Sequence, residues 1–130
     1  MPIFDKVTKY SVSVFQTNVQ PATRQIRLSL ASGGTASISF TATLPSDWLQ
    51  FVGSATNLFM TTDQFTDVYH VLQTESPVFF TALDLFGLRV GSVHTELELD
   101  SGETPGEGDE DPQSLEALIR RARREGTDRA

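Results

Sequence analysis

The side chains in this sequence that could do chemistry are few and widely spaced. The 130 residues contain two histidines, His70 and His94, and no cysteine. A metal site needs about three or four converging ligands, so either histidine would have to recruit carboxylates from other segments. His94 shares an alternating face with Glu96 and Glu98, but leucines occupy the reverse positions, which is typical of the solvated face of a strand. We therefore expect no metal site.

Acid–base catalysis has one candidate group, formed by Asp63, Asp67 and His70. Asp67 precedes His70 by three residues on the polar side of a predicted helix, where an ion pair is worth only a few tenths of a kcal/mol. Paired carboxylates also need burial and contrasting environments that separate their pKa values. The polar side of a helix supplies neither, so we interpret these three residues as a solvated surface.

Nucleophilic and nucleotide-binding motifs are missing from the sequence. The serines fall at outward positions of predicted strands, and none sits in a Gly-x-Ser-x-Gly pattern. The glycines at 33 and 34 lack the lysine and spacing of a phosphate-binding loop, and a hairpin turn explains both of them. The absence of cysteine excludes disulfides, zinc–thiolate sites and thiol catalysis. The sequence thus predicts a non-enzymatic protein without a cofactor.

Charge and hydropathy further limit the classes of partner and the location that we expect. The net charge is -7, which opposes general binding to the phosphate backbone, so we do not expect a nucleic-acid partner. No apolar run is long enough to cross a membrane, and the first residues lack the pattern of a signal peptide, so the expected location is cytoplasmic. Residues 101–130 hold eight acids and five bases, and all five bases are arginines after position 119.

Residues 1–99 have the pattern of a single β-rich globular domain. Apolar residues alternate with Ser, Thr and Arg over several short segments, and Ser32-Gly33-Gly34 separates two of them as a hairpin turn would. Gly91 shifts the alternation of the last segment as a bulge would. We predict an α+β fold with a mainly antiparallel sheet of about six strands. The predicted strands cover 10–14, 25–30, 36–42, 57–60, 78–83 and 88–99.

One helix is expected to pack on this sheet, and a second helical turn to close one end of it. Phe65, Val68, Tyr69 and Leu72 follow the spacing of a helix face, starting after Asp63 and ending before Pro77. The turn would carry Trp48, Leu49, Phe51 and Val52 behind a cap at Ser46 or Asp47. The predicted core contains Phe40, Phe65 and one of Phe79 and Phe80.

Two features of the domain suggest contact with other chains. The strand Val78–Leu83 is apolar on both faces, so both faces need cover, and we expect a homo-oligomer. Leu85 and Phe86 lie at a predicted turn tip, where two large apolar side chains favour a partner, although they could also fold back on the core.

The last thirty residues divide into two parts. Residues 100–111 are rich in acids and glycine and contain no base or large apolar residue, so they are predicted to be a disordered linker. Residues 112–126 begin with Pro112 after Asp111 and end at Gly126, which predicts an amphipathic, arginine-rich helix. Such a short helix is marginal alone in water, so its apolar stripe should dock on its own domain, another protein or an anionic surface.

We favour a protein groove as the destination of this helix, because its stripe has no aromatic anchor for lipid. The leading hypothesis is a non-enzymatic adaptor or assembly component that oligomerises through its body and recruits a partner protein with the tethered helix. The alternative is a small apolar ligand-binding module lined by phenylalanines and Trp48. The predicted partner-binding residues are Leu115, Leu118, Ile119, Ala122, Arg120, Arg121, Arg123, Arg124, Leu85 and Phe86.

Overall fold

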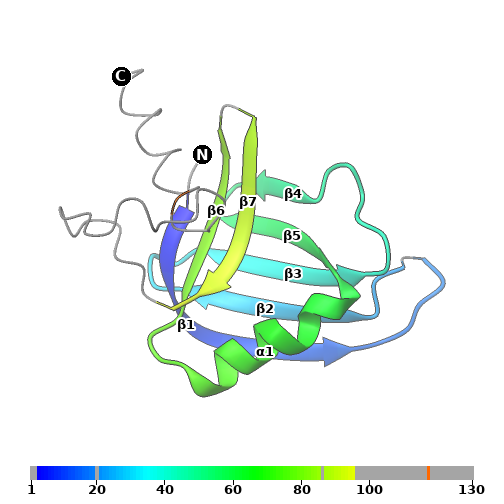
Figure 1. Cartoon of the computed structure of the whole chain (residues 1–130), viewed down its shortest axis with the longest axis horizontal. Coiled ribbons are helices and arrows are strands. Elements are labelled where there is room, and N and C mark those ends of the chain that lie inside the picture. The colour runs from blue at the N-terminus through cyan, green and yellow to red at the C-terminus, as the bar shows by residue number, and fades with distance from the viewer. Residues whose placement is uncertain (1–2, 20, 86, 96–116, 118–130) are drawn as a thin grey trace.

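A computed structural model of the chain describes residues 3–19, 21–85, 87–95 and 117 (Figure 1). Its seven-stranded sheet has the order β4-β5-β3-β2-β1-β6-β7, in which only β3 and β5 are parallel neighbours. The α+β class is confirmed, but a sheet of about six antiparallel strands was wrong. The elements are β1 (Ile3–Val14), β2 (Arg24–Leu30), β3 (Thr35–Thr41), β4 (Leu49–Val52), β5 (Ala55–Thr61), η1 (Thr62–Gln64), α1 (Phe65–Thr74), β6 (Phe79–Leu85) and β7 (Leu88–His94).

The mixed sheet follows from a hairpin that the sequence did not reveal. Residues 49–52 form strand β4 rather than the predicted helical turn, and they pair with residues 55–58 of β5. Gly53 makes the tight connection at φ +61°, a left-handed conformation that glycine adopts freely. Returning through β4 places β5 beside β3 in parallel register. Four apolar residues are too few for periodicity to distinguish a helical turn from a strand.

Strand β1 holds the two halves of the sheet together. Its residues Ile3–Lys6 pair with β6, while its residues from Val7 to Val14 pair with β2. The pairing with β2 is irregular between Val7 and Lys9, where the strand leaves one partner for the other. Figure 1 shows the result: β6 and β7 run across the direction of β2, β3 and β5. The sheet therefore curls toward a closed cylinder.

The two end strands meet where this curl nearly closes. Arg89 of β7 donates a hydrogen bond to the carbonyl oxygen of Ser46 at 3.0 Å, and its guanidinium lies 5.4 Å from the centre of the Trp48 ring. Leu58 of β5 packs directly against Gly91 of β7. The two ends of the sheet are thus linked by the contacts of Arg89 and by the apolar contact of Leu58 with Gly91.

Helix α1 covers the apolar inner face of the sheet, as its spacing predicts. Val68 and Leu72 are buried, and Phe65 packs edge-on against Phe40 with ring centres 5.1 Å apart. Phe40 and Phe80 are completely buried, so the predicted phenylalanine core is confirmed, with Phe65 half-buried at its border. The predicted hairpin at residues 32–34 is also confirmed, because the N–H of Gly33 donates to the Leu30 carbonyl at 2.9 Å.

Strand β6 needs no second chain to cover either of its faces. Phe80 and Ala82 are buried on one face, and Thr81 and Leu83 are buried on the other, all within a single chain. The strand is apolar on both faces because the chain itself covers both. An oligomer therefore needs a different surface.

Gly91 does not form the predicted bulge. The register of β6 and β7 runs without a shift through the pair Ala82 and Gly91. A Cβ atom at position 91 would lie 2.5 Å from Cδ1 of Leu58. Glycine is required there because the side chain of Leu58, from β5 in the other half of the sheet, occupies the space.

The predicted linker 100–111 and helix 112–126 lie outside the described residues, except that Ala117 is helical. Residues 96–99 of the predicted last strand are also outside them. Within the part of the chain that the structure describes, no helix is long and apolar enough to cross a membrane.

Replacing Gly91 with alanine should lower the free energy of unfolding by about 1–3 kcal/mol, because the buried Leu58 must move. The control is the double-mutant cycle with Leu58→Val, which alone should cost about 1 kcal/mol. In the Leu58→Val background the cost of Gly91→Ala should shrink, as measured by denaturant unfolding. Additive effects would show that this contact does not dictate the glycine.

Candidate functional site

The outer face of strands β1–β5 is lined by hydroxyl and amide side chains. The pairing register places Ser11, Arg27, Ser37, Asn57 and Gln50 in one row across the five strands. Their neighbours along each strand point to the opposite, apolar face, where the core and α1 lie. We call this outer surface the polar face.

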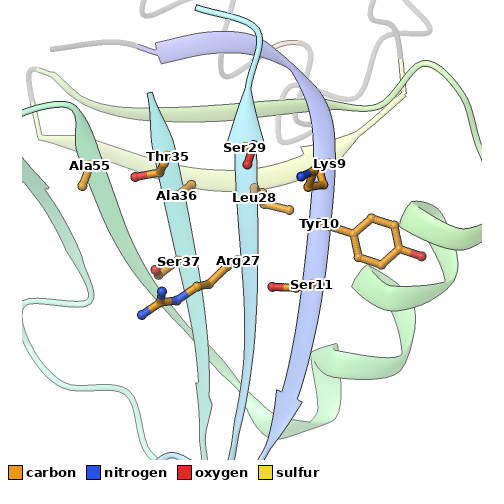
Figure 2. Close-up of a pocket in the computed structure, with 10 residues that line it drawn as sticks. All are labelled: Lys9, Tyr10, Ser11, Arg27, Leu28, Ser29, Thr35, Ala36, Ser37 and Ala55. Carbon is orange, nitrogen blue, oxygen red and sulfur yellow. The ribbon is translucent and has the colours of Figure 1, made fainter. Parts of the chain in front are cut away.

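Two hollows of about 450 and 520 Å³ lie on the polar face and share Arg27 and Ser37. They adjoin at these two residues, and we call the pair of hollows the trough. Figure 2 shows the Arg27 side chain reaching across β3 beside Ser37, while Tyr10 points away toward α1. The first hollow is lined by Lys9, Tyr10, Ser11, Arg27, Leu28, Ser29, Thr35, Ala36, Ser37 and Ala55. The second is lined by Pro21, Gln25, Arg27, Ser37, Ser39, Thr41, Thr43, Pro45, Asp47, Gln50, Asn57 and Phe59.

The centre of the trough is cationic. Arg27 and Lys9 are its basic residues, and within the described residues neither side chain makes an ion pair. The one carboxylate in the lining, Asp47, accepts a hydrogen bond from Nε2 of Gln50 at 2.5 Å. The remaining polar groups are neutral, and Gln25 donates to Oγ of Ser39 at 3.2 Å.

The trough sits on a body with almost no net charge. Residues 3–95 contain five bases and six acids, a difference of -1, whereas residues 96–130 contain five bases and eleven acids, a difference of -6. The described body thus contributes little of the overall charge of -7. A guanidinium surrounded by hydroxyl and amide groups can pair with a carboxylate or phosphate and hydrogen-bond its hydroxyl groups.

The prediction that His94 lies on a solvated strand face was wrong, because its side chain is only 8% exposed. Its Nδ1 lies 2.6 Å from the Thr95 carbonyl oxygen, which can only accept, so Nδ1 carries the hydrogen. Its Nε2 shares a hydrogen bond with the hydroxyl of Thr81, also at 2.6 Å. The rings of Phe4 and Phe79 lie 5.6 and 6.2 Å from the imidazole. His94 therefore has a defined place in the packing of β6 and β7.

The other chemical candidates lie where the sequence placed them. Asp63, Asp67 and His70 are exposed on η1 and α1, on the polar side of the helical segment. Within the residues that the structure describes, no three histidine, aspartate or glutamate side chains form a group that could hold a metal ion. The two histidines thus occupy unrelated settings, one exposed and one buried.

Of the predicted partner-binding residues, only Leu85 can be located. It is half-buried at the end of β6 and pairs with Leu88 across the hairpin that Gly87 completes at φ +81°. Phe86 and the apolar and arginine residues of the 112–126 segment lie outside the described residues. The sequence reasoning missed the trough. Its one available signal was Arg27 standing among outward serines on three predicted strands.

Comparison of the chain with protein-family models, with curated proteins and with solved structures found no match.

The Thr81 hydroxyl should contribute measurably to stability because it bonds the buried imidazole of His94. Replacing Thr81 with valine keeps the shape but removes the hydroxyl, and should cost about 1–3 kcal/mol of unfolding free energy. Thr56 is a matched control: it is equally buried at 1%, and its hydroxyl has no partner within the described residues. Thr56→Val should leave the stability unchanged or raise it. Equal effects in thermal or urea unfolding would contradict a role for the His94 bond.

Proposed function

We propose that this protein is a non-enzymatic adaptor or assembly component. Its body would associate with other chains, and its C-terminal segment would recruit a partner protein. The observation that carries this proposal is the number of large apolar side chains that the body leaves in solvent, against two histidines that share no site. The exposed side chains are Val19 at 82%, Val14 at 72%, Val52 at 59%, Phe4 at 47% and Leu44 at 40%.

Two of the three exposed valines, Val14 and Val19, lie near each other in the sequence. Val14 ends β1, and Val19 lies in the loop that leads from β1 to β2. Single exposed apolar residues are common in monomers, so the proposal uses the pair formed by the end of β1 and the loop after it. This connection is therefore the first place to look for a contact between bodies.

The recruiting role rests on the composition of residues 112–126. Leu115, Leu118 and Ile119 provide a narrow apolar stripe at helical spacing, and the acidic segment before them provides reach. A stripe of this size gains most when a groove of another protein covers it. Arginines toward the end of the segment would add hydrogen bonds to an acidic rim.

Ending the chain at residue 111 should abolish capture of the recruited protein while leaving the melting temperature of the body nearly unchanged. The measurement is quantitative mass spectrometry of proteins retained by the immobilised chain. A Leu118→Ser variant of the full chain should lose capture about tenfold or more, because it interrupts the stripe. Glu116→Gln is the matched control and should retain it. Unchanged capture by the shortened chain would refute the recruiting role.

A second function, binding of a small polar anion, is favoured by the trough. The apolar ligand module considered above would use phenylalanines and Trp48, but Phe40 and Phe80 are packed in the core and Trp48 lies beneath Arg89. The hollows that the described residues line are instead bordered by hydroxyls, amides and Arg27. Their chemistry suits a sugar acid or sugar phosphate.

Replacing Arg27 with serine should weaken binding of glucuronate or glucose 6-phosphate at least tenfold, because the guanidinium supplies the charged contact. Neutral glucose should bind weakly and equally to both proteins. Lys6→Ser is the matched control, since it removes the same charge from an exposed residue that does not line the trough. Chemical-shift titration measures the affinity of the unmodified chain and of both variants for these ligands. Equal affinity of the Arg27→Ser variant for the anions would exclude this function.

A further inference from the structure

The backbone of β1 has one edge that no described strand pairs. The N–H of Phe15 donates to the carbonyl of Thr23 at 2.8 Å, in continuation of the register that joins β1 to β2. In an antiparallel pair, alternate residues direct both backbone groups toward the same neighbour. The odd-numbered residues from Lys9 to Phe15 therefore face β2. The N–H and C=O groups of Tyr10, Val12 and Val14 face the other way.

Strand β6 occupies that other edge only at the start of β1. The pairing with β6 ends at Lys6, and the last bond on that side runs from the N–H of Val7 to the carbonyl of Val78 at 2.8 Å. Beyond it, the C-terminal half of β1 forms the lower border of the sheet in Figure 1. Within the described part of the chain, no strand covers this border.

This edge lacks the features that usually protect sheet edges. Residues 10–14 read Tyr-Ser-Val-Ser-Val, without a charge, proline or glycine. The end strands of the sheet are better protected: β4 has only four residues, and β7 is tied to Ser46 and Trp48 by Arg89. The open stretch of β1 is thus the part of the sheet best suited to accept another strand.

We propose that residues 10–14 of β1 pair antiparallel with the same residues of a second copy of this chain, about a twofold axis at Val12. Val12 then faces Val12 of the partner subunit, and Tyr10 faces Val14 of the partner subunit. Each of these pairs exchanges both N–H···O bonds, because all of the groups involved point outward. This inference rests on the association half of the proposed function and names its surface.

The side chains fit this register on both faces of the sheet. On the apolar face, Val14, which is 72% exposed, is covered by Tyr10 of the partner subunit. On the polar face, Ser11 lies opposite Ser13 of the partner subunit, and Lys9 lies opposite Phe15 of the partner subunit. No like charges face each other.

A second copy is the occupant that the edge itself favours. It brings the same unpaired backbone groups in the same number, so one pairing satisfies both edges at once. The surface is self-complementary about a single residue, which is the condition for a closed twofold dimer. A helix or an irregular loop would leave most of these backbone groups unpaired.

The self-opposed position of Val12 permits a charge-exchange test by light scattering or sedimentation. The unmodified chain should be a concentration-dependent dimer. Val12→Lys and Val12→Glu, each of which places like charges opposite each other, should be monomers with an intact circular dichroism spectrum. Mixing the two variants should restore a one-to-one dimer. Dimers of either charged variant alone, or a mixture that stays monomeric, would overturn the proposal.

Amide hydrogen exchange of the unmodified chain tests the same register without a substitution. The N–H groups of Tyr10, Val12 and Val14 should be protected at high protein concentration and should exchange faster on dilution. If the chain dimerises without protecting them, the bodies associate through another surface and the proposed function stands without this edge. A monomer at all concentrations would refute both the edge and the association half, leaving the recruiting segment to its own test.

Discussion

The division of β1 between two partners is the constraint on which the rest of this fold depends. One continuous strand pairs with β6 over Ile3–Lys6 and with β2 from Val7 onward, and the irregularity between Val7 and Lys9 is the bend that permits it. Without that bend, β6 and β7 would continue the sheet alongside β1. With it, they turn across the other strands, and Phe80 of β6 and Phe40 of β3 become buried members of one core.

The same bend explains what the fold leaves open. A strand can pair on two edges, but once β6 has separated from β1 at Val7, the outer edge of the later residues has no described neighbour. At the far side of the sheet the curl brings β7 close to β4, where Arg89 contacts Ser46 and Trp48. The C-terminal half of β1 is thus an open edge inside the sheet order, in addition to the outer edges of the end strands β4 and β7.

Local patterns predicted the local structure well and the long-range structure poorly. The period of two around Ile26, Leu28 and Leu30 and the helical spacing of Val68 and Leu72 reflect burial on one face, which the sequence records directly. The parallel pairing of β3 with β5 depends on where the chain goes after a four-residue strand, and no local period records that. Gly91 is an example: glycine is needed there because of contact with Leu58, 33 residues earlier, and not because of a feature of its own strand.

The candidate sites were also hard to predict, because they depend on residues that are distant in the sequence. His94 follows a polar alternation that reads as solvated, yet the rings of Phe4 and Phe79 and the Thr81 hydroxyl enclose it. A buried polar side chain is predictable only when its partners are known, since its cost depends on them. The trough could not be predicted from the sequence because it depends on the register of the strands. Outward serines alone indicate only a solvated strand face. The register places them in one row with Arg27 across five strands.

The separation of charge along the chain bears on whether two bodies can meet. A net charge of -7 spread evenly would oppose self-association, but residues 3–95 contribute only -1 of it. Repulsion between charges in water is screened over about 8 Å at physiological ionic strength, so what matters is the charge beside the contact. The nearest charge on the open edge of β1 is Lys9, and the stretch that follows it is neutral. The described body therefore places little like charge beside this edge.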